Sequence, residues 1–227
     1  ILEETANTGG RAFGRLFVEI SSRRKYDLDG EGLTQSALIA KFHDPDRETR
    51  RKAAASLTEG VQSDSHAINF IYNTLLSEKQ TKDRLRGFDT PEASRHLGNE
   101  VDPAVVEAMV DTCVANYGVV SDYYDLKRGL LGVDELTHYD RYAPITGDTS
   151  DVPFGEAKEL VLDSFDGFSA ELRDAAEPFF TKRWIDAALA DHKQGGAYCA
   201  GVTPGLHPYV FMNYMGTPRD VMTLAYE

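Results

Sequence analysis

The 227-residue sequence contains only two cysteines, Cys113 and Cys199, and they lie far apart. This pair provides neither a disulfide framework nor a CxxC metal knuckle, so a reducing, cytoplasmic location is the simplest expectation. No apolar run approaches the ~18 residues that would span a bilayer. The start of the sequence also lacks the basic and then apolar order of a signal peptide. We therefore expect no membrane partner, although a start at Ile1 leaves an upstream signal open.

Basic residues are also in deficit, because 24 Lys and Arg face 37 Asp and Glu, which gives a formal net charge of −13. Such an acidic chain is poorly suited to neutralising phosphates, so no nucleic-acid partner is expected. One basic cluster stands out, and its members are Arg47, Arg50, Arg51 and Lys52. Acidic residues flank this cluster, which predicts a solvated helix face with i,i+4 ion pairs.

Apolar residues recur mostly at helical spacing, which predicts a mainly α fold arranged as an irregular bundle. Expected helices cover residues 11–24, a stretch from about 65, and residues 121–131, 154–165 and 169–180. Four further helix starts are marked by a cap residue followed by proline, at Asp44-Pro45, Thr90-Pro91, Asp102-Pro103 and Thr217-Pro218. The first three of these helices are expected to end at left-handed caps on Gly60, Gly98 and Gly118.

A small β element is expected near residues 195–214. The stretch from Gly195 to Ala200 is small and partly β-prone, and residues 209–214 are rich in aromatic and β-branched side chains. Turn-forming residues separate the two, so we predict two short strands joined by a loop. Neither a repeat nor a low-complexity linker divides the chain, and no clear internal domain boundary is expected within residues 1–227.

The last eleven residues predict a helix with a well-defined start. Thr217 can cap it, Asp220 can reach back to the cap N–H, and this pair approximates a capping box. An apolar face follows, made of Val221, Leu224 and Ala225. No C-cap or stop signal precedes Glu227, so we expect the sequence to stop within this helix.

These residues carry a resemblance to a known family. The run from His207 to Tyr214, followed by residues 217–225, resembles the approach to the zinc helix of oligoendopeptidase F, a thimet oligopeptidase-like zinc metallopeptidase. Upstream segments are similar in the same order: Ser94-Arg95, residues 123–128, residues 139–144, residues 184–186 and residues 195–199. The resemblance implies that residues 1–227 are a partial catalytic region of a zincin-like oligopeptidase, truncated at both ends.

The resemblance also implies the chemistry. In this family the helix continues as His-Glu-x-x-His, in which the two His bind zinc and the Glu acts as general base on zinc-activated water that hydrolyses oligopeptides. Glu227 matches the catalytic Glu, whereas Tyr226 stands at the position of the first His ligand. A phenol binds metal well only after losing a proton, so the fragment itself is expected to hold no zinc and to be inactive. Tyr226 is compatible with a change in the sequence or with a natural inactive relative.

The resemblance further implies a substrate-binding strand at Gly196, Ala197 and Tyr198, because glycine permits close backbone approach and strand pairing is independent of substrate sequence. His207 and Tyr209 are candidates for lining the cleft and polarising the scissile carbonyl. The alternatives are a structural hairpin and a loop His beside a packing Tyr. Two other functions stay open: a non-catalytic peptide-binding relative that has lost its metal site, and an unrelated helical interaction domain.

Overall fold

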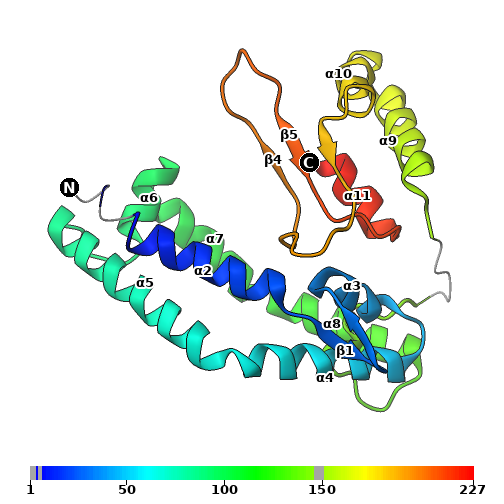
Figure 1. Cartoon of the computed structure of the whole chain (residues 1–227), viewed down its shortest axis with the longest axis horizontal. Coiled ribbons are helices and arrows are strands. Elements are labelled where there is room, and N and C mark those ends of the chain that lie inside the picture. Colours follow the sequence, from blue (N-terminus) through cyan, green and yellow to red (C-terminus); the bar gives the residue numbers. More distant parts are fainter. Residues whose placement is uncertain (1–3, 5–6, 146–150) are drawn as a thin grey trace. The chain divides into compact units, whose positions relative to one another are not determined.

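A computed structural model describes residue 4, residues 7–145 and residues 151–227 (Figure 1). Helices dominate these residues and the strands are short, which confirms the expected mainly α fold. None of the described helices is long and apolar enough to cross a membrane. The chain divides into two compact units, one formed by residues 1–18 and 61–138 and the other by residues 19–60 and 139–227.

The regular elements among the described residues of the first unit are all helices. Its helices are α2 (Gly10–Arg23, which continues into the second unit), α5 (Ser65–Arg86), α6 (Ala93–Asn99), α7 (Pro103–Ala115) and α8 (Tyr117–Leu131). The predicted cap at Asp102 is confirmed, since its carboxylate accepts a hydrogen bond from the N–H of Ala104 at 2.8 Å and Pro103 is the first helical residue. Phe13 of α2 contacts Phe70 of α5, with ring centroids 5.9 Å apart.

The second unit begins with a hairpin that the sequence analysis missed. Strand β1 (Tyr26–Leu28) pairs antiparallel with β2 (Glu31–Leu33), and α3 (Gln35–Ala40), the 3-10 turn η1 (Lys41–His43) and α4 (Arg47–Ser63) follow. Asp29 and Gly30 form the turn with φ of 55° and 89°. An Asp-Gly pair is a strong hairpin signal because both central residues of a type I′ turn need positive φ.

The basic cluster on α4 is not a purely solvated face, and the prediction was wrong for Arg50, which is 3% exposed. Asp140, in the 3-10 turn η2 (His138–Asp140), is fully buried and binds Arg50 at 2.9 Å and Arg47 at 2.8 Å. Nη1 of Arg50 donates to the carbonyls of Asp44 and Pro45, whereas its buried Nε has no hydrogen-bond partner among the described residues. A buried carboxylate needs such pairing, so this ion pair fixes residue 140 on α4.

The rest of the second unit combines helices with a three-stranded sheet. Its helices are α9 (Phe154–Phe168), α10 (Ala170–Thr181) and α11 (Pro218–Tyr226), and its strands are β3 (Ile185–Asp186), β4 (Tyr198–Ala200) and β5 (Tyr209–Phe211). The strand order is β3-β5-β4, with β3 parallel and β4 antiparallel to β5. Strands β4 and β5 confirm the predicted β element, whereas β3 was not predicted.

The three glycines expected to end helices do not do so. Gly60 lies within α4, Gly98 within α6 and Gly118 within α8. Glu100, in the left-handed region, ends α6, and Asn116 caps α7. Gly60 has a packing reason instead, because a Cβ there would lie 2.5 Å from Cε1 of the buried Tyr26 ring. Glycine at position 60 is therefore explained by close contact with the Tyr26 ring of the hairpin, and not by the end of a helix.

We predict that Gly60→Ala destabilises the chain, although alanine is the better helix former. The added methyl group must displace the Tyr26 ring, and overpacking of this kind costs about 1–3 kcal/mol. Gly14→Ala is the matched control, because Gly14 is also inside a helix and a Cβ there would meet nothing within 4 Å. That control should gain roughly 0.5–1 kcal/mol. Urea unfolding of both variants measures the difference, and equal gains in the two would contradict the packing account.

Candidate functional site

Helix α11 begins at a complete capping box. The hydroxyl of Thr217 accepts from the N–H of Asp220 at 3.2 Å, and the carboxylate of Asp220 accepts from the N–H of Thr217 at 3.0 Å. The same carboxylate also accepts from the N–H of Met215 at 3.1 Å. This confirms the predicted start of the helix, and it leaves Asp220 committed to backbone donors. The entry angle of α11 is therefore fixed by hydrogen bonds that its own first turn provides.

The two faces of α11 differ sharply in exposure. Leu224 is 6% exposed and belongs to a core cluster with Ala157 and Val161 of α9 and Met212, which directly follows β5. Val221 and Ala225 pack against the same cluster, as the apolar pattern predicted. The opposite face lies in solvent. Met222 is 73% exposed and Tyr226 is 87% exposed, so both side chains point outward.

The segment before α11 is tied to the start of α9. The hydroxyl of Tyr214 donates to the carbonyl of Val152 at 2.6 Å, and the N–H of Val152 donates to the carbonyl of Gly216 at 2.9 Å. Burial raises the pKa of Tyr214, and the negative charges of Asp220, Asp151 and Glu156 raise it further. Tyr214 therefore acts as a neutral hydrogen-bond donor that supports the approach to α11.

Glu227 completes the last turn at the end of α11. Its N–H donates to the carbonyl of Thr223 at 3.0 Å, and its side chain is half-buried. Among residues 4, 7–145 and 151–227, no group of three or more His, Cys, Asp or Glu is placed to hold a metal ion. The expected roles of Tyr226 at a ligand position and of Glu227 as general base therefore stay predictions.

Strand β4 lies at an edge of the sheet, and its three residues are all exposed. It pairs with β5 in the register Tyr198 to Phe211, Cys199 to Val210 and Ala200 to Tyr209. An exposed edge presents unpaired main-chain donors and acceptors to another extended chain.

The two residues before β4 set how it approaches the sheet. Gly196 has φ of +97°, a conformation that favours glycine, and Ala197 packs against the core cluster that holds Leu224. The ring of Tyr198, which follows, stacks on Phe211 at 5.0 Å. The candidate residues Gly196, Ala197 and Tyr198 therefore lead into an open strand edge that shares its core with α11.

A buried lysine, which sequence reasoning missed, holds the loop before β4. The side chain of Lys193 is 8% exposed, and its ammonium donates to the carbonyls of Asp186, Ala188 and Met212 at 3.1, 2.7 and 2.8 Å. It also pairs with the Asp186 carboxylate at 2.9 Å and lies 4.6 Å from the centre of the Phe211 ring. One side chain thus joins the end of β3, the end of β5 and the loop between β3 and β4.

Asn213 continues this attachment next to β4. Its side-chain amide donates to the carbonyls of Gln194 at 2.9 Å and Gly196 at 3.2 Å. Both acceptors lie within four residues of Tyr198, so Asn213 fixes the approach to the edge strand. The sequence around Lys193, a lysine followed by Gln-Gly-Gly, does not indicate that the lysine is buried. The carbonyls that accept from its ammonium belong to segments up to 19 residues away.

The candidates His207 and Tyr209 belong to a ring cluster on the other side of β5. His207 stacks on Trp184 with centroids 3.6 Å apart and planes 7° apart, and it meets the edge of Tyr209 at 4.7 Å. Lys182 lies 5.1 Å from the Trp184 ring. Tyr209 is exposed at 56%. Among the described residues, no hydrogen bond or ring contact joins this pair to Tyr226 or Glu227, so their proposed role in the cleft stays a prediction.

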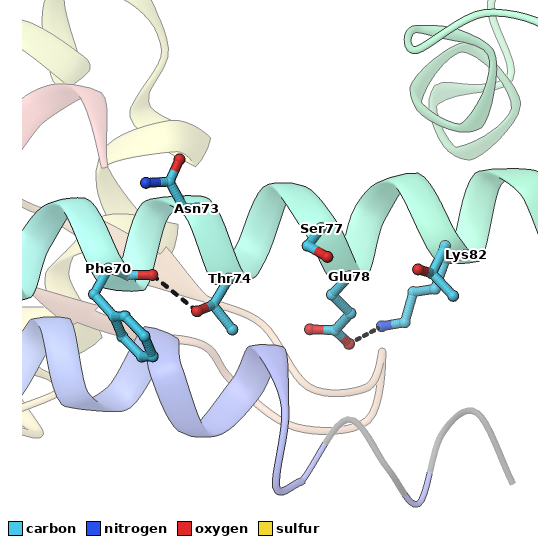
Figure 2. Close-up of a pocket in the computed structure, with 7 residues that line it drawn as sticks. Phe70, Asn73, Thr74, Ser77, Glu78 and Lys82 are labelled. Atoms are coloured by element: carbon cyan, nitrogen blue, oxygen red, sulfur yellow. Dashed lines mark hydrogen bonds and ion pairs between the residues drawn. The ribbon is translucent and has the colours of Figure 1, made fainter.

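Another concavity lies in the first unit, along α5. It has a volume of about 550 Å³ and is lined by seven residues of this one helix, including Phe70, Asn73 and Ser77. Figure 2 shows two polar pairs along the helix, with Glu78 bound to Lys82 at 2.6 Å and Thr74 donating to the carbonyl of Phe70. Such i,i+4 pairs are ordinary on an exposed helix, so this depression does not form a site.

Comparison with known proteins gives a consistent family. The sequence profile of Peptidase family M3 matches residues 41–227. The chain is 27% identical over 204 residues to an oligoendopeptidase F homolog of Borreliella burgdorferi, covering 88% of this chain and 34% of that protein. It is 26% identical over 210 residues to the oligopeptidase PepF of Bacillus subtilis, covering 88% and 30%. The chain thus spans about a third of the length of the curated relatives it matches.

Solved structures share the fold. The structure of PZ peptidase A with inhibitor 2 superimposes with a TM-score of 0.85 at 18% identity, covering 93% of this chain and 39% of that one. An oligoendopeptidase F from Enterococcus faecium gives a TM-score of 0.52 at 19% identity, covering 75% and 35%. At these identities the likeness concerns the fold alone.

We predict that Lys193→Met destabilises the chain by about 3 kcal/mol, because three carbonyls and a carboxylate lose a charged donor. Amide hydrogen exchange at residues 198–200 should also accelerate, since the loop that positions β4 is released. Lys182→Met is the matched control. The side chain of Lys182 is exposed and its ammonium lies over the Trp184 ring, so its loss should cost less than about 1 kcal/mol. Unchanged exchange in β4 of Lys193→Met would show that Lys193 does not position the strand.

Proposed function

The chain belongs to Peptidase family M3, and from that premise we propose that it is part of a peptidase that hydrolyses short peptides. Within the chain, the part of this function that the residues support is binding of an extended peptide. Strand β4 would add the peptide as a further strand, and the exposed face of α11 would lie beside it. The hydrolytic step of the full-length enzyme would use Glu227 as general base.

The exposed edge of β4 carries this proposal. All three residues of β4 are exposed, and the preceding Ala197 packs against the same core as Leu224 of α11. Pairing with a strand edge uses the main chain of the peptide, so it accepts varied sequences, as a general oligopeptidase requires. The unrelated helical interaction domain considered as an alternative loses its support, because the chain belongs to Peptidase family M3.

Pairing with β4 makes a prediction about the peptide backbone. In a peptide paired with β4, every second N–H group points toward β4 and the intervening N–H groups point away. An eight-residue peptide can therefore be N-methylated at either of two alternating sets of residues, and only the set that faces β4 should weaken binding. Loss of two hydrogen bonds of about 1 kcal/mol each should weaken binding to this chain by tenfold or more. The control is the same peptide methylated at the intervening positions, which should bind as tightly as the parent. Fluorescence anisotropy measures both, and equal weakening by the two sets would rule out strand pairing.

The donor chemistry of this chain does not fit catalytic zinc. A tetrahedral zinc site in a peptidase uses three protein ligands and one open position, and this chain offers a phenol, Tyr226, at the first of these positions. We therefore assign zinc to the full-length enzyme as the resemblance implies, and we propose that the 227-residue chain binds no catalytic zinc and hydrolyses no peptide by itself. Glu227 would contribute its carboxylate only where the ligands are complete.

This proposal is tested by the zinc content of the purified chain. After exposure to zinc and gel filtration, metal analysis should find well below one zinc per chain, because a lone phenol binds weakly. The Tyr226→His variant should also stay well below one equivalent, since one imidazole does not make a site. Stoichiometric zinc in the unchanged chain, lost in Tyr226→Phe, would overturn the assignment and make Tyr226 a ligand.

A second candidate function is a non-catalytic peptide-binding protein, and Tyr226 is the observation that favours it. The phenol occupies the ligand position while the edge strand and the apolar core beneath α11 are intact. Both functions predict peptide binding through β4. The two functions can be distinguished in a protein of the same length as the relatives. There, Tyr226→His should produce peptide hydrolysis only if the remaining metal ligands are present.

A further inference from the structure

We propose that Arg219, held against Tyr142, forms a site for the C-terminal carboxylate of a short peptide, and this inference rests on the peptide binding proposed above. Arg219 is exposed in the first turn of α11, and its guanidinium carbon lies 5.3 Å from the centre of the Tyr142 ring. The inference deepens the proposed function, because it states which end of the peptide is recognised and how far that end lies from Glu227.

Arg219 belongs to the solvent face of α11. With Met222 and Tyr226 it has the spacing i, i+3 and i+7, and seven residues turn a helix through almost two full turns, so the three side chains form one stripe. The opposite stripe, Val221, Leu224 and Ala225, is packed in the core. The exposed stripe is thus amphipathic, with a cation at its start, a methionine in the middle and the family's ligand position at its end.

Tyr142 supports the guanidinium from below. His43 stacks on Tyr142 with centroids 5.0 Å apart and planes 29° apart, and Arg141 also lies 5.3 Å from its ring centre. A contact between a cation and a ring face consumes none of the N–H donors of Arg219. Those donors can meet a carboxylate with two parallel hydrogen bonds, which is the geometry that distinguishes arginine from lysine.

Arg219 brings positive charge to a surface of mixed charge, in a chain that carries −13 as a whole. Asp140 lies between Arg47 and Arg50, whereas Asp220 accepts from backbone N–H groups and keeps its negative charge. In the part of the chain that the structure describes, no carboxylate pairs with Arg219. Its N–H donors can therefore meet the carboxylate of a peptide.

The length of the stripe sets the length of the peptide. Seven residues of helix correspond to about 10 Å along the axis. An extended peptide advances about 3.3 Å per residue, so about three residues separate a carboxylate on Arg219 from a peptide bond beside Tyr226 and Glu227. The geometry therefore selects peptides in which about three residues follow the peptide bond that lies beside Glu227. It also requires the carboxyl end of the peptide to lie toward the start of α11.

The experiment compares one fluorescently labelled eight-residue peptide as the free acid and as the C-terminal amide. With the unchanged 227-residue chain, the amide should bind about tenfold to a hundredfold more weakly, because it loses a charge-assisted pair. In Arg219→Gln, the free acid should bind only as well as the amide, so the ratio of the two dissociation constants falls to about one. Arg219→Lys should restore part of the ratio, since it keeps the charge and loses the fork.

Matched variants separate recognition from folding. Arg84→Gln removes the same charge from an exposed position on α5, and its acid-to-amide ratio should equal that of the unchanged chain. Tyr142→Phe keeps the ring and should keep the ratio, whereas Tyr142→Leu should reduce it. Circular dichroism and thermal unfolding identify any variant that fails to fold, and the comparison between Arg219→Lys and Arg219→Gln remains decisive because both keep a long side chain.

The outcomes distinguish this inference from the function on which it rests. If neither peptide binds the unchanged chain, peptide binding itself is wrong and the inference falls with it. If both peptides bind equally and the N-methylation pattern holds, strand pairing stands and the carboxylate site is refuted. An acid-to-amide ratio that survives in Arg219→Gln would place carboxylate recognition elsewhere and would also refute the site.

Discussion

The buried ammonium of Lys193 is the interaction on which the candidate site depends. A charge removed from water is tolerated only where it is paired and hydrogen-bonded, and Lys193 meets this requirement with three carbonyls and the Asp186 carboxylate. Those acceptors belong to the end of β3, the loop after it and the residue after β5. Satisfying one charge therefore brings three segments together. The strand β4, which follows this loop, is placed as a consequence, and Asn213 completes the attachment.

The shared core extends this placement to α11. Met212 follows β5 and contacts the cluster that holds Leu224, while Ala197 reaches the same cluster from the residue before β4. Burial of a leucine side chain contributes about 1.5–3 kcal/mol, so α11 and the sheet are held by a common apolar contact rather than by separate supports. In the described part of the chain, the outer face of α11 contributes no residue to this core, and the outer edge of β4 is exposed. Both are available for a ligand.

Some signals confined to a few residues predicted the structure, although the glycines expected to end helices did not, and features that need distant partners were missed. The capping box of Thr217 and Asp220 and the strands β4 and β5 could be predicted, since their causes lie within a few residues. Lys193 and Arg50 were missed or misjudged because their acceptors are supplied by other segments of the fold. The prediction that Gly60 ends a helix failed for the same reason, because this glycine is required by contact with the distant Tyr26 ring. The roles of Glu227, His207 and Tyr209 still rest on resemblance.

The proposed peptide binding and the proposed metal chemistry rest on different parts of this chain. Tyr226 is 87% exposed and lies on the face of α11 that carries no core contact, so replacing a ligand there removes little packing. The peptide binding that we propose would depend instead on the main chain of β4 and on Arg219, whose positions are set by Lys193, the capping box and Tyr142. A change at residue 226 would therefore have little effect on the fold or on the proposed strand pairing. Retention of the edge strand in a chain with Tyr226 is the expected result of this separation, whichever of the two functions holds.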